Sequence, residues 1–500
     1  MLPPVSTIEV RNPATGLLSG SVQCTSPVEL AAAVGRAREA QKGWYRTSYS
    51  NRARIIARFH DLVLDNSARV FDTIQSETGK SRRDALAELV TVAGTARYYL
   101  AHGERFLAAR RKRGAIPLIT RSVLAFRPHG LVGLITPWNY PFLLTVGDAL
   151  PALLAGNAVF VKPSEWTPLS AALGKSLLVD SGLDPNLLTV VQGGADAGNE
   201  VIRHVDYIAF TGGTVTGRKV AVAAAERLIP FSLELGGKNP MIVLKDAPLE
   251  HAAAALVAGA FSNAGQTCIA VERVYVEAPV FDRFANLVAD SASKIKVGWS
   301  QSFDLDMGSM IHATHAGSVQ DRVDNAIRSG ASVLAGGRRR SDLGEAFVEP
   351  TVLAEVGQKD PIAVEETFGP VVSLHRVADR DEAIALANDS PYGLNASVWA
   401  GRSSRAMEVA QEIEAGSVAL NSSLMIYNAF DVPMGGVKKS GIGRRHGERG
   451  ILRYTQEQSI VRSFETGGGY DRMLAGIRTD GRVGTLLKFI RLWRRLPGLR

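Results

Sequence analysis

Cysteine is scarce in this chain of 500 residues, which contains only Cys24 and Cys268. So few cysteines argue against a disulfide scaffold and fit a reducing compartment. No run of eighteen apolar residues occurs, and the richest stretch, 252–261, is alanine-rich and too short to cross a membrane. The amino terminus lacks the basic and apolar regions of a signal peptide. We therefore expect a cytoplasmic protein.

Net positive charge is also small outside the carboxyl-terminal tail. Residues 470–500 contain eight Lys or Arg and two Asp, a net charge of +6, which leaves only +2 of the total +8 for the rest of the chain. No basic face with interleaved aromatic residues appears elsewhere, so we expect no nucleic-acid partner. The one other basic cluster, Arg110 to Arg113, is interpreted as a solvated connector after a helix.

What is present is the composition of a globular protein, with 46% hydrophobic and 21% charged residues and no internal repeat. A chain of this length exceeds a single typical core, so two or more domains are expected. Apolar residues at helical spacing predict helices at Pro27–Lys42, Asn51–Asp65 and Ser81–Leu100.

Short apolar runs then alternate with helical stretches. Four of them end in polar or Gly/Pro loops and are predicted strands: Leu131–Ile135, Ala158–Val161, Leu188–Val191 and Tyr207–Phe210. A second series begins at Met241–Leu244 and continues to Gly416, with a strand at Val274–Val276 and a helix at Ala313–Ser329. This alternation predicts an α/β protein with parallel sheets, whose ligands bind at the carboxyl ends of the strands.

The segment Phe261–Cys268 contains the strongest nucleophile candidate. A cysteine can add to a carbonyl carbon and later leave from a thioester, provided that its surroundings help it to ionise. Taken alone, Cys268 would more often be an inert buried thiol.

Two further motifs supply complementary chemistry. In Leu233–Pro240, Glu234 stands at a strand-to-turn junction, where a carboxylate can act as the general base that activates water. In Pro137–Pro141, the amide of Asn139 can stabilise an oxyanion, an effect worth about 3–4 kcal/mol for preorganised donors. Alone, Glu234 would usually be a surface carboxylate and Asn139 a turn residue.

Together these three motifs resemble those of the aldehyde dehydrogenase superfamily, and the resemblance runs from about Asn12 to Ser463. It continues through five further motifs in family order: Lys162–Glu165, Phe210–Gly217, Glu365–Pro370, Pro433–Gly436 and Lys439–Arg444. It implies a Rossmann-type cofactor domain, an α/β catalytic domain and a small bridging β-sheet.

The resemblance also implies residue roles. Cys268 would be the nucleophile, Glu234 the base, and Asn139 with the Cys268 backbone N–H the oxyanion hole. No metal ligands are assigned. The residues that would bind the cofactor are Thr136, Trp138, Lys162, Glu165, Gly213, Gly217, Glu366 and Phe368.

The intact Glu234 favours release of the thioester to water, because CoA-acylating relatives usually lack this base. A non-enzymatic protein with this fold would tolerate loss of the cysteine, so the presence of Cys268 argues against that alternative. For the cofactor we predict NAD, because a carboxylate at Glu165 that holds the ribose hydroxyls would repel a 2′-phosphate. NADP stays an alternative, since Lys162 can pair with a phosphate.

The substrate is open between two classes. Segments 231–243 and 392–401 resemble bacterial proteins labelled succinate-semialdehyde dehydrogenases, yet the Arg that grips the substrate carboxylate in many of them is replaced here by Gly147. The alternative is a fatty or aromatic aldehyde. The apolar or aromatic residues that would form its pocket, or simply pack a helix, are Tyr140, Phe142, Leu143, Leu144 and Val146.

The predicted organisation has four parts. They are a dinucleotide-binding domain (1–115 and 129–236), a catalytic domain (237–450), bridging strands (116–128 and 451–466) and a basic amphipathic tail (467–500) after a Gly467–Gly469 hinge. Because family members assemble through such strands, we expect a homodimer or homotetramer. The tail would lie on an anionic membrane or on a protein surface.

Overall fold

In the computed structural model, residues 6–113, 120–463, 475 and 480–493 are described. They form two compact units, one from Met1–Leu107 and Pro128–Gln456 and the other from Ala108–Arg127 and Glu457–Arg500. The predicted Gly467–Gly469 hinge lies outside the described residues.

The first unit contains a six-stranded sheet in the order β19-β9-β8-β5-β6-β7. Its strands are β5 (Leu131–Ile135), β6 (Ala158–Lys162), β7 (Leu188–Val190), β8 (Tyr207–Thr211), β9 (Phe231–Glu234) and β19 (Gly441–Ile442). All neighbours are parallel except β19, which is antiparallel to β9. The chain order reverses between β5 and β8, which is where an open α/β sheet forms its ligand crevice.

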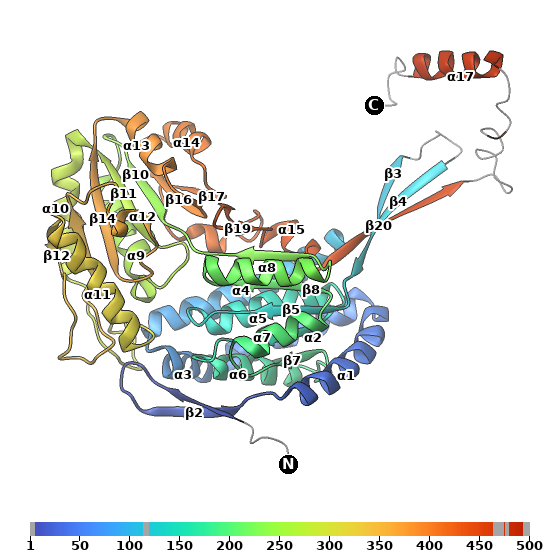
Figure 1. Cartoon of the computed structure of the whole chain (residues 1–500), viewed down its shortest axis with the longest axis horizontal. Coiled ribbons are helices and arrows are strands. Elements are labelled where there is room, and N and C mark those ends of the chain that lie inside the picture. Colours follow the sequence, from blue (N-terminus) through green and yellow to red (C-terminus); the bar gives the residue numbers. More distant parts are fainter. Residues whose placement is uncertain (1–5, 114–119, 464–474, 476–479, 494–500) are drawn as a thin grey trace. The chain divides into compact units, whose positions relative to one another are not determined.

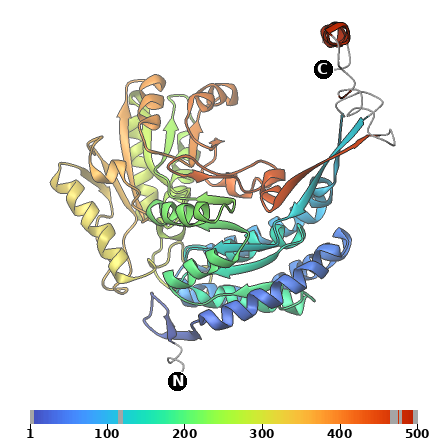
Figure 2. The same ribbon diagram turned by 45° about the vertical axis from the view of Figure 1, so that its right-hand side comes forward.

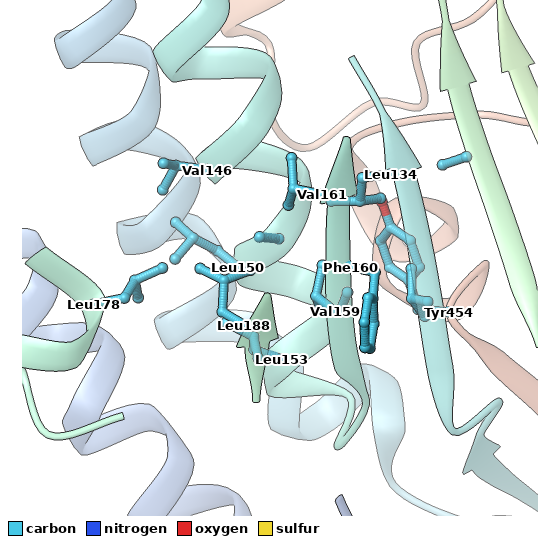
Figure 3. Packing of buried hydrophobic residues seen from close by; sticks show 14 of the residues in the cluster. Leu134, Val146, Leu150, Leu153, Val159, Phe160, Val161, Leu178, Leu188 and Tyr454 are labelled. Carbon is cyan, nitrogen blue, oxygen red and sulfur yellow. The ribbon is translucent and has the colours of Figure 1, made fainter. Parts of the chain in front are cut away.

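Helices cover both faces of this sheet. The helices α5 (Pro141–Leu154) and α6 (Pro168–Asp180) contact each other and the sheet, as do α7 (Ala195–His204) and α8 (Thr214–Glu226). Strands buried on both faces are continuously apolar, as expected for a parallel sheet. Figure 3 shows Leu150 and Leu153 of α5 facing Val159 and Val161 of β6.

The amino-terminal segment adds further helices around this core. They are α1 (Pro27–Arg46), α2 (Tyr49–Asp65), α3 (Ser67–Thr78) and α4 (Arg82–Leu107), after a hairpin of β1 (Thr7–Arg11) and β2 (Leu18–Gln23). In Figure 2, α1 lies against the six-stranded sheet, where it contacts α7. The sequence predicted α1, α2 and α4 but not the separate helix α3.

A seven-stranded sheet forms the second half of the same unit, in the order β12-β13-β14-β11-β10-β16-β17 (Figure 1). Its strands are β10 (Asn239–Val243), β11 (Val271–Glu277), β12 (Ser332–Ala335), β13 (Thr351–Ala354), β14 (Val371–Val377), β16 (Asn395–Trp399) and β17 (Ser417–Leu420). The helices of this half are α9 (Leu249–Phe261), α10 (Phe281–Ser293), α11 (Ala313–Arg328), α12 (Pro361–Val364), α13 (Arg380–Asn388) and α14 (Ser403–Glu412). A separate apolar core underlies this sheet.

The sheet membership differs from the predicted division at β19, and also at β3 (Arg110–Arg113), described below. The strand β19 falls within 237–450, the predicted catalytic segment, yet it pairs with β9 in the six-stranded sheet. The reason is local, because the free edge of β9 offers backbone groups that β19 satisfies. The short helix α15 (Gly447–Leu452) follows it.

The second unit contains a three-stranded sheet in the order β20-β4-β3 and the helix α17 (Asp480–Trp493). The strands β4 (Thr120–Pro128) and β20 (Thr455–Ser463) lie in the segments predicted as strands. The prediction of a solvated connector at Arg110 to Arg113 is wrong, because these residues form β3 and pair with β4. An edge strand tolerates cationic side chains, and the Arg110 guanidinium lies 4.9 Å from the ring centre of Phe126.

Candidate active site

A cavity of about 370 Å³ lies at the carboxyl ends of β5, β8 and β9. Of the eleven residues assigned from the sequence, seven line it: Trp138, Asn139, Gly213, Glu234, Cys268, Glu366 and Phe368. Thus five segments separated in the sequence supply one site, next to the point where the order of strands in the sheet reverses.

Cys268 stands at the end of a strained loop between α9 and β11. Asn263 and Ala264 both have φ of 53° and Gly265 has φ of 69°, a left-handed conformation that non-glycine residues rarely adopt. The thiol is partly exposed to the cavity. Burial raises the pKa of Cys268 to about 12, although the Arg445 guanidinium opposes this effect. The thiol is therefore protonated at neutral pH until a base or a bound ligand changes its surroundings.

The Asn139 side chain faces the same loop. Its Nδ2 donates to the Gln266 backbone oxygen at 2.9 Å, which leaves the second amide hydrogen for a ligand. Its own backbone oxygen accepts from Lys80 Nζ at 2.6 Å and from Asn263 Nδ2 at 3.0 Å. The residue is thus fixed on both sides, as a preorganised oxyanion donor requires.

Glu234 is the last residue of β9, opposite Thr211 of β8 and Gly441 of β19. It is buried, and its Oε1 has no hydrogen-bond partner among the described residues. Burial raises its pKa to about 7, against the lowering effect of Arg445 and Arg453. A carboxyl group that titrates near neutral pH suits general-base chemistry.

The cofactor side of the cavity is formed around α8. Its N-cap residue Gly213 has no side-chain cap, and a Cβ placed there would meet nothing within 4 Å. Open backbone N–H groups at a helix start favour a pyrophosphate. Trp138 and Phe368 make an edge-to-face contact with ring centres 5.5 Å apart, and Glu366 Oε1 accepts from Gly237 N at 3.0 Å. These features fit a dinucleotide.

The other four assigned residues do not line the cavity. Lys162, at the end of β6, forms an ion pair with Glu165 at 3.4 Å. The Thr136 hydroxyl is buried and lies 3.3 Å from that of Thr145. A Cβ at Gly217 would lie 2.5 Å from Leu235, so this glycine allows α8 to pack closely. Direct cofactor contacts of these four remain predictions.

The substrate side of the cavity includes residues that the sequence did not reveal. The five apolar or aromatic residues that the sequence suggested for a substrate pocket fall into two groups. Tyr140, Leu143 and Leu144 line the cavity, whereas Phe142 and Val146 belong to the core. The missed residues come from distant elements and share no motif: Asp84, Ala87, Thr91, Leu424, Tyr427 and Asn428. Only their tertiary position could have identified them.

Three further charged residues lie behind the substrate side of the cavity, next to Tyr427. Arg445 Nη2 and Arg453 Nη2 each lie 2.9 Å from an oxygen of Asp148, and Arg445 Nη1 donates to the Tyr427 hydroxyl at 3.2 Å. The only sequence signal was that Arg445 directly follows the Lys439–Arg444 motif.

The strand order, the open start of α8 and the buried carboxylate beside a cysteine define an NAD(P)-dependent oxidoreductase. Residues 3–460 match the model of the "Aldehyde dehydrogenase family". The chain belongs to the aldehyde dehydrogenase family.

Relatives support the same family. The protein named "putative succinate-semialdehyde dehydrogenase NADP(+)" of Mycolicibacterium smegmatis is 44% identical over 457 residues, covering 90% of this chain and 88% of its own. The mitochondrial succinate-semialdehyde dehydrogenase of Arabidopsis thaliana is 35% identical, covering 90% and 85% of the two chains.

Solved structures agree with these relatives. Succinate-semialdehyde dehydrogenase from Burkholderia pseudomallei has a TM-score of 0.88 at 35% identity, covering 92% of this chain and 95% of its own. Mycobacterium tuberculosis aldehyde dehydrogenase complexed with NAD+ has a TM-score of 0.88 at 32% identity, covering 92% and 96%. The predicted α/β fold and family are confirmed. In the described part of the chain, no helix has the length and apolarity to cross a membrane.

Proposed function

We propose that this aldehyde dehydrogenase oxidises an uncharged aldehyde to its carboxylic acid through a thioester on Cys268. The thiol passes its proton to a water molecule as its sulfur bonds to the carbonyl carbon, and Asn139 Nδ2 donates to the resulting oxyanion. When bound, the nicotinamide supplies the hydride acceptor. Water then attacks the thioester, Glu234 takes a proton from this water, and the acid leaves as the Cys268 sulfur is released.

One observation supports an uncharged substrate: among the described residues that line the cavity, none is Lys, Arg or His. The ionisable side chains on its wall other than Cys268 and the tyrosines are the carboxyl groups of Asp84, Glu234 and Glu366. The absence of Arg at Gly147 is thus not offset by a cation elsewhere on the wall. A substrate carboxylate would be desolvated there without a partner, at a cost of several kcal/mol.

Succinate semialdehyde is the second candidate substrate, because the names of the Mycolicibacterium, Arabidopsis and Burkholderia relatives include it. Hydroxyl and amide groups of Thr91, Thr267 and Asn428 on the cavity wall would then have to hold the distal carboxylate.

Butanal and succinate semialdehyde form a matched pair for the test, since each has four carbons and only one has a carboxylate. We expect a higher kcat/KM for butanal, and a longer straight-chain aldehyde to exceed it further. A higher kcat/KM for succinate semialdehyde would overturn the uncharged-substrate proposal. A Cys268→Ala protein supplies the background rate.

For the cofactor we propose a preference for NAD over NADP. The Glu165 carboxylate is half exposed and paired with Lys162, so a 2′-phosphate beside it would meet like charge and would compete for this lysine. The printed names of the mycobacterial relatives include NADP(+) instead. Comparing kcat/KM for both cofactors in the wild type and in Glu165→Gln tests the proposal: Gln should raise the efficiency of NADP relative to that of NAD. A wild type that prefers NADP would contradict it.

We also propose a homodimer or homotetramer built through β20. This strand is an edge of its sheet and exposes Ile460 and Val461. Light scattering after gel filtration should give a multiple of the 53.5 kDa chain, and Ile460→Asp should lower the measured mass. A wild type that is monomeric at micromolar concentration would refute this proposal.

For the tail, the two alternatives are contact with an anionic membrane and contact with a protein surface. Helix α17 exposes Val483 and Leu487 beside the cationic Lys488 and Arg491. Sedimentation with phosphatidylserine vesicles at low salt distinguishes them, because only a membrane contact would carry the protein into the pellet. A chain ending at residue 463 serves as the control.

A further inference from the structure

A buried cluster of two arginines and one aspartate lies behind the reaction cavity. Asp148 of α5 holds Arg445 and Arg453 at 2.9 Å each, and the three side chains are between 6% and 11% exposed. The cluster therefore contains one more positive than negative charge. Buried charges are rarely left unbalanced, because their desolvation costs several kcal/mol.

The surplus charge lies close to the reacting groups. The Arg445 guanidinium donates to the Thr211 hydroxyl, and Thr211 is opposite Glu234 in the sheet. On the other side of Glu234 is Gly441, four residues before Arg445. Arg445 also donates to the Tyr427 hydroxyl, and Tyr427 lines the cavity together with Glu234 and Cys268. The same strand pairings thus position the carboxylate and the guanidinium.

Unsatisfied polar atoms support an electrostatic role. Among the described residues, Glu234 Oε1, Arg445 Nε, and Arg453 Nε and Nη1 are buried without hydrogen-bond partners. A cavity of about 20 Å³ bounded by Arg445, His446 and Arg453 has room for about one water molecule. The cluster is therefore not a closed set of hydrogen bonds, and its excess charge can act on nearby groups.

We propose that Arg445, supported by Arg453 and Asp148, is a positioning residue whose buried positive charge favours the carboxylate form of Glu234 and the thiolate form of Cys268. The inference rests on the roles proposed above for these two residues. The other charged or titratable groups that interact with them are Arg444, Glu366, Tyr140, Tyr207 and Tyr427. Arg445 is the largest opposing influence on the raised pKa of both Glu234 and Cys268, and Asp148 acts on Glu234 in the reverse direction.

The opposite charges of Arg445 and Asp148 allow a test by sign. The rate of alkylation of Cys268 by iodoacetamide is measured at several pH values between 7 and 9 in a Cys24→Ser background, which leaves one reactive cysteine. Below the pKa of the thiol this rate is proportional to the thiolate fraction. Arg445→Gln should lower the rate at each pH about tenfold, and Asp148→Asn should raise it. Arg445→Lys, which keeps the charge, should restore most of the wild-type rate.

A matched control separates this effect from general destabilisation. Arg52 is another buried arginine, whose guanidinium donates to the backbone oxygens of Thr47 and Leu154. Arg52→Gln should leave the alkylation rate unchanged even where it lowers the melting temperature. Unchanged rates in Arg445→Gln and Asp148→Asn, or shifts of the same sign in both, would overturn the proposal and leave the cluster with only a structural role.

The alkylation assay needs neither aldehyde nor cofactor, so it does not depend on the proposed substrate. Failure of the proposed function would appear instead as absent NADH formation by a wild type whose Cys268 alkylates normally. The pH profile of steady-state turnover in the same variants then reports on Glu234, whose protonated fraction should rise in Arg445→Gln.

Discussion

Lys80 donates a hydrogen bond from Nζ to the backbone oxygen of Asn139 at 2.6 Å and another to Glu88 Oε1 at 2.7 Å. Both side chains are almost completely buried. Glu88 Oε2 in turn accepts from the backbone N–H groups of Phe142 and Leu143 at 3.0 Å, at the start of α5. One ion pair therefore fixes both the helix and the loop that presents the Asn139 amide to the cavity.

Replacing Lys80 should damage both stability and catalysis. Lys80→Met leaves Glu88 as an uncompensated buried charge, so the free energy of unfolding should fall by about 3–5 kcal/mol. Urea denaturation measures this loss, and kcat should fall because Asn139 is no longer held. Lys42→Met removes an exposed pair with Glu39 and should cost less than about 1 kcal/mol. Equal stability of the two variants would contradict the assigned role of Lys80.

The two cysteines should differ completely in their effect on turnover. Cys268→Ala removes the only thiol that lines the cavity and should reduce NADH formation to the background rate. Cys24→Ala is the matched control and should retain full activity, because Cys24 does not line the cavity. Substantial activity in Cys268→Ala would show that the proposed thioester is wrong.

Glu234→Gln should separate the two halves of the reaction. The first turnover should still release NADH, whereas steady-state turnover should fall about 10²–10⁴-fold because thioester hydrolysis loses its base. In the wild type, hydrolysis should accelerate as pH rises through about 7, where Glu234 loses its proton, and level off above. Stopped-flow absorbance at several pH values measures both. A variant with an unchanged steady-state rate would exclude Glu234 as the base.

The same residue should affect stability in a pH-dependent way. Burial raises the pKa of Glu234 from its ordinary 4.5 to about 7, so its favourable contribution is complete below pH 4.5 and is lost as pH rises through 7. At about 1.4 kcal/mol for each pH unit, this loss amounts to about 3 kcal/mol. Glu234→Gln has no carboxyl group to ionise, so its free energy of unfolding should not show this loss. Chemical denaturation should therefore show that the stability of the variant relative to the wild type rises between pH 5 and 8. A constant difference would indicate that Glu234 is ionised throughout.

Two glycines of one motif should respond differently to alanine. Gly213→Ala meets open space at an ordinary backbone angle, so stability should hold while the Kd for NAD rises about tenfold, because the Cβ stands where the pyrophosphate approaches. Gly217→Ala would place a Cβ 2.5 Å from Leu235 and should cost about 1–3 kcal/mol of stability. Calorimetry and cofactor titration measure both variants, and the assignment fails if their effects are exchanged.

The sequence alone predicted the α/β class and six of the parallel strands, and it suggested reacting residues that line one cavity in the structure. These predictions depend on local signals: β5 is an uninterrupted apolar run, and the loops after β5, β8 and β9 contain recognisable motifs at strand ends. Helix α3 was not predicted, although Val70, Phe71 and Ile74 have helical spacing within its 12 residues. The strand β3 was predicted as a connector because its four residues are all cationic and show no apolar alternation.

Only the tertiary structure determines which residues line the substrate side of the cavity and which charges surround Glu234. Thr91 and Asn428 touch across 337 positions of sequence, and Asp148 meets Arg445 across 297. Such pairs have no spacing that a pattern could detect, and each charge acquires its effect only when burial removes water from around it. The residues proposed as nucleophile and base were therefore recognised from local motifs, whereas their protonation and the substrate that reaches them depend on the packing of distant elements.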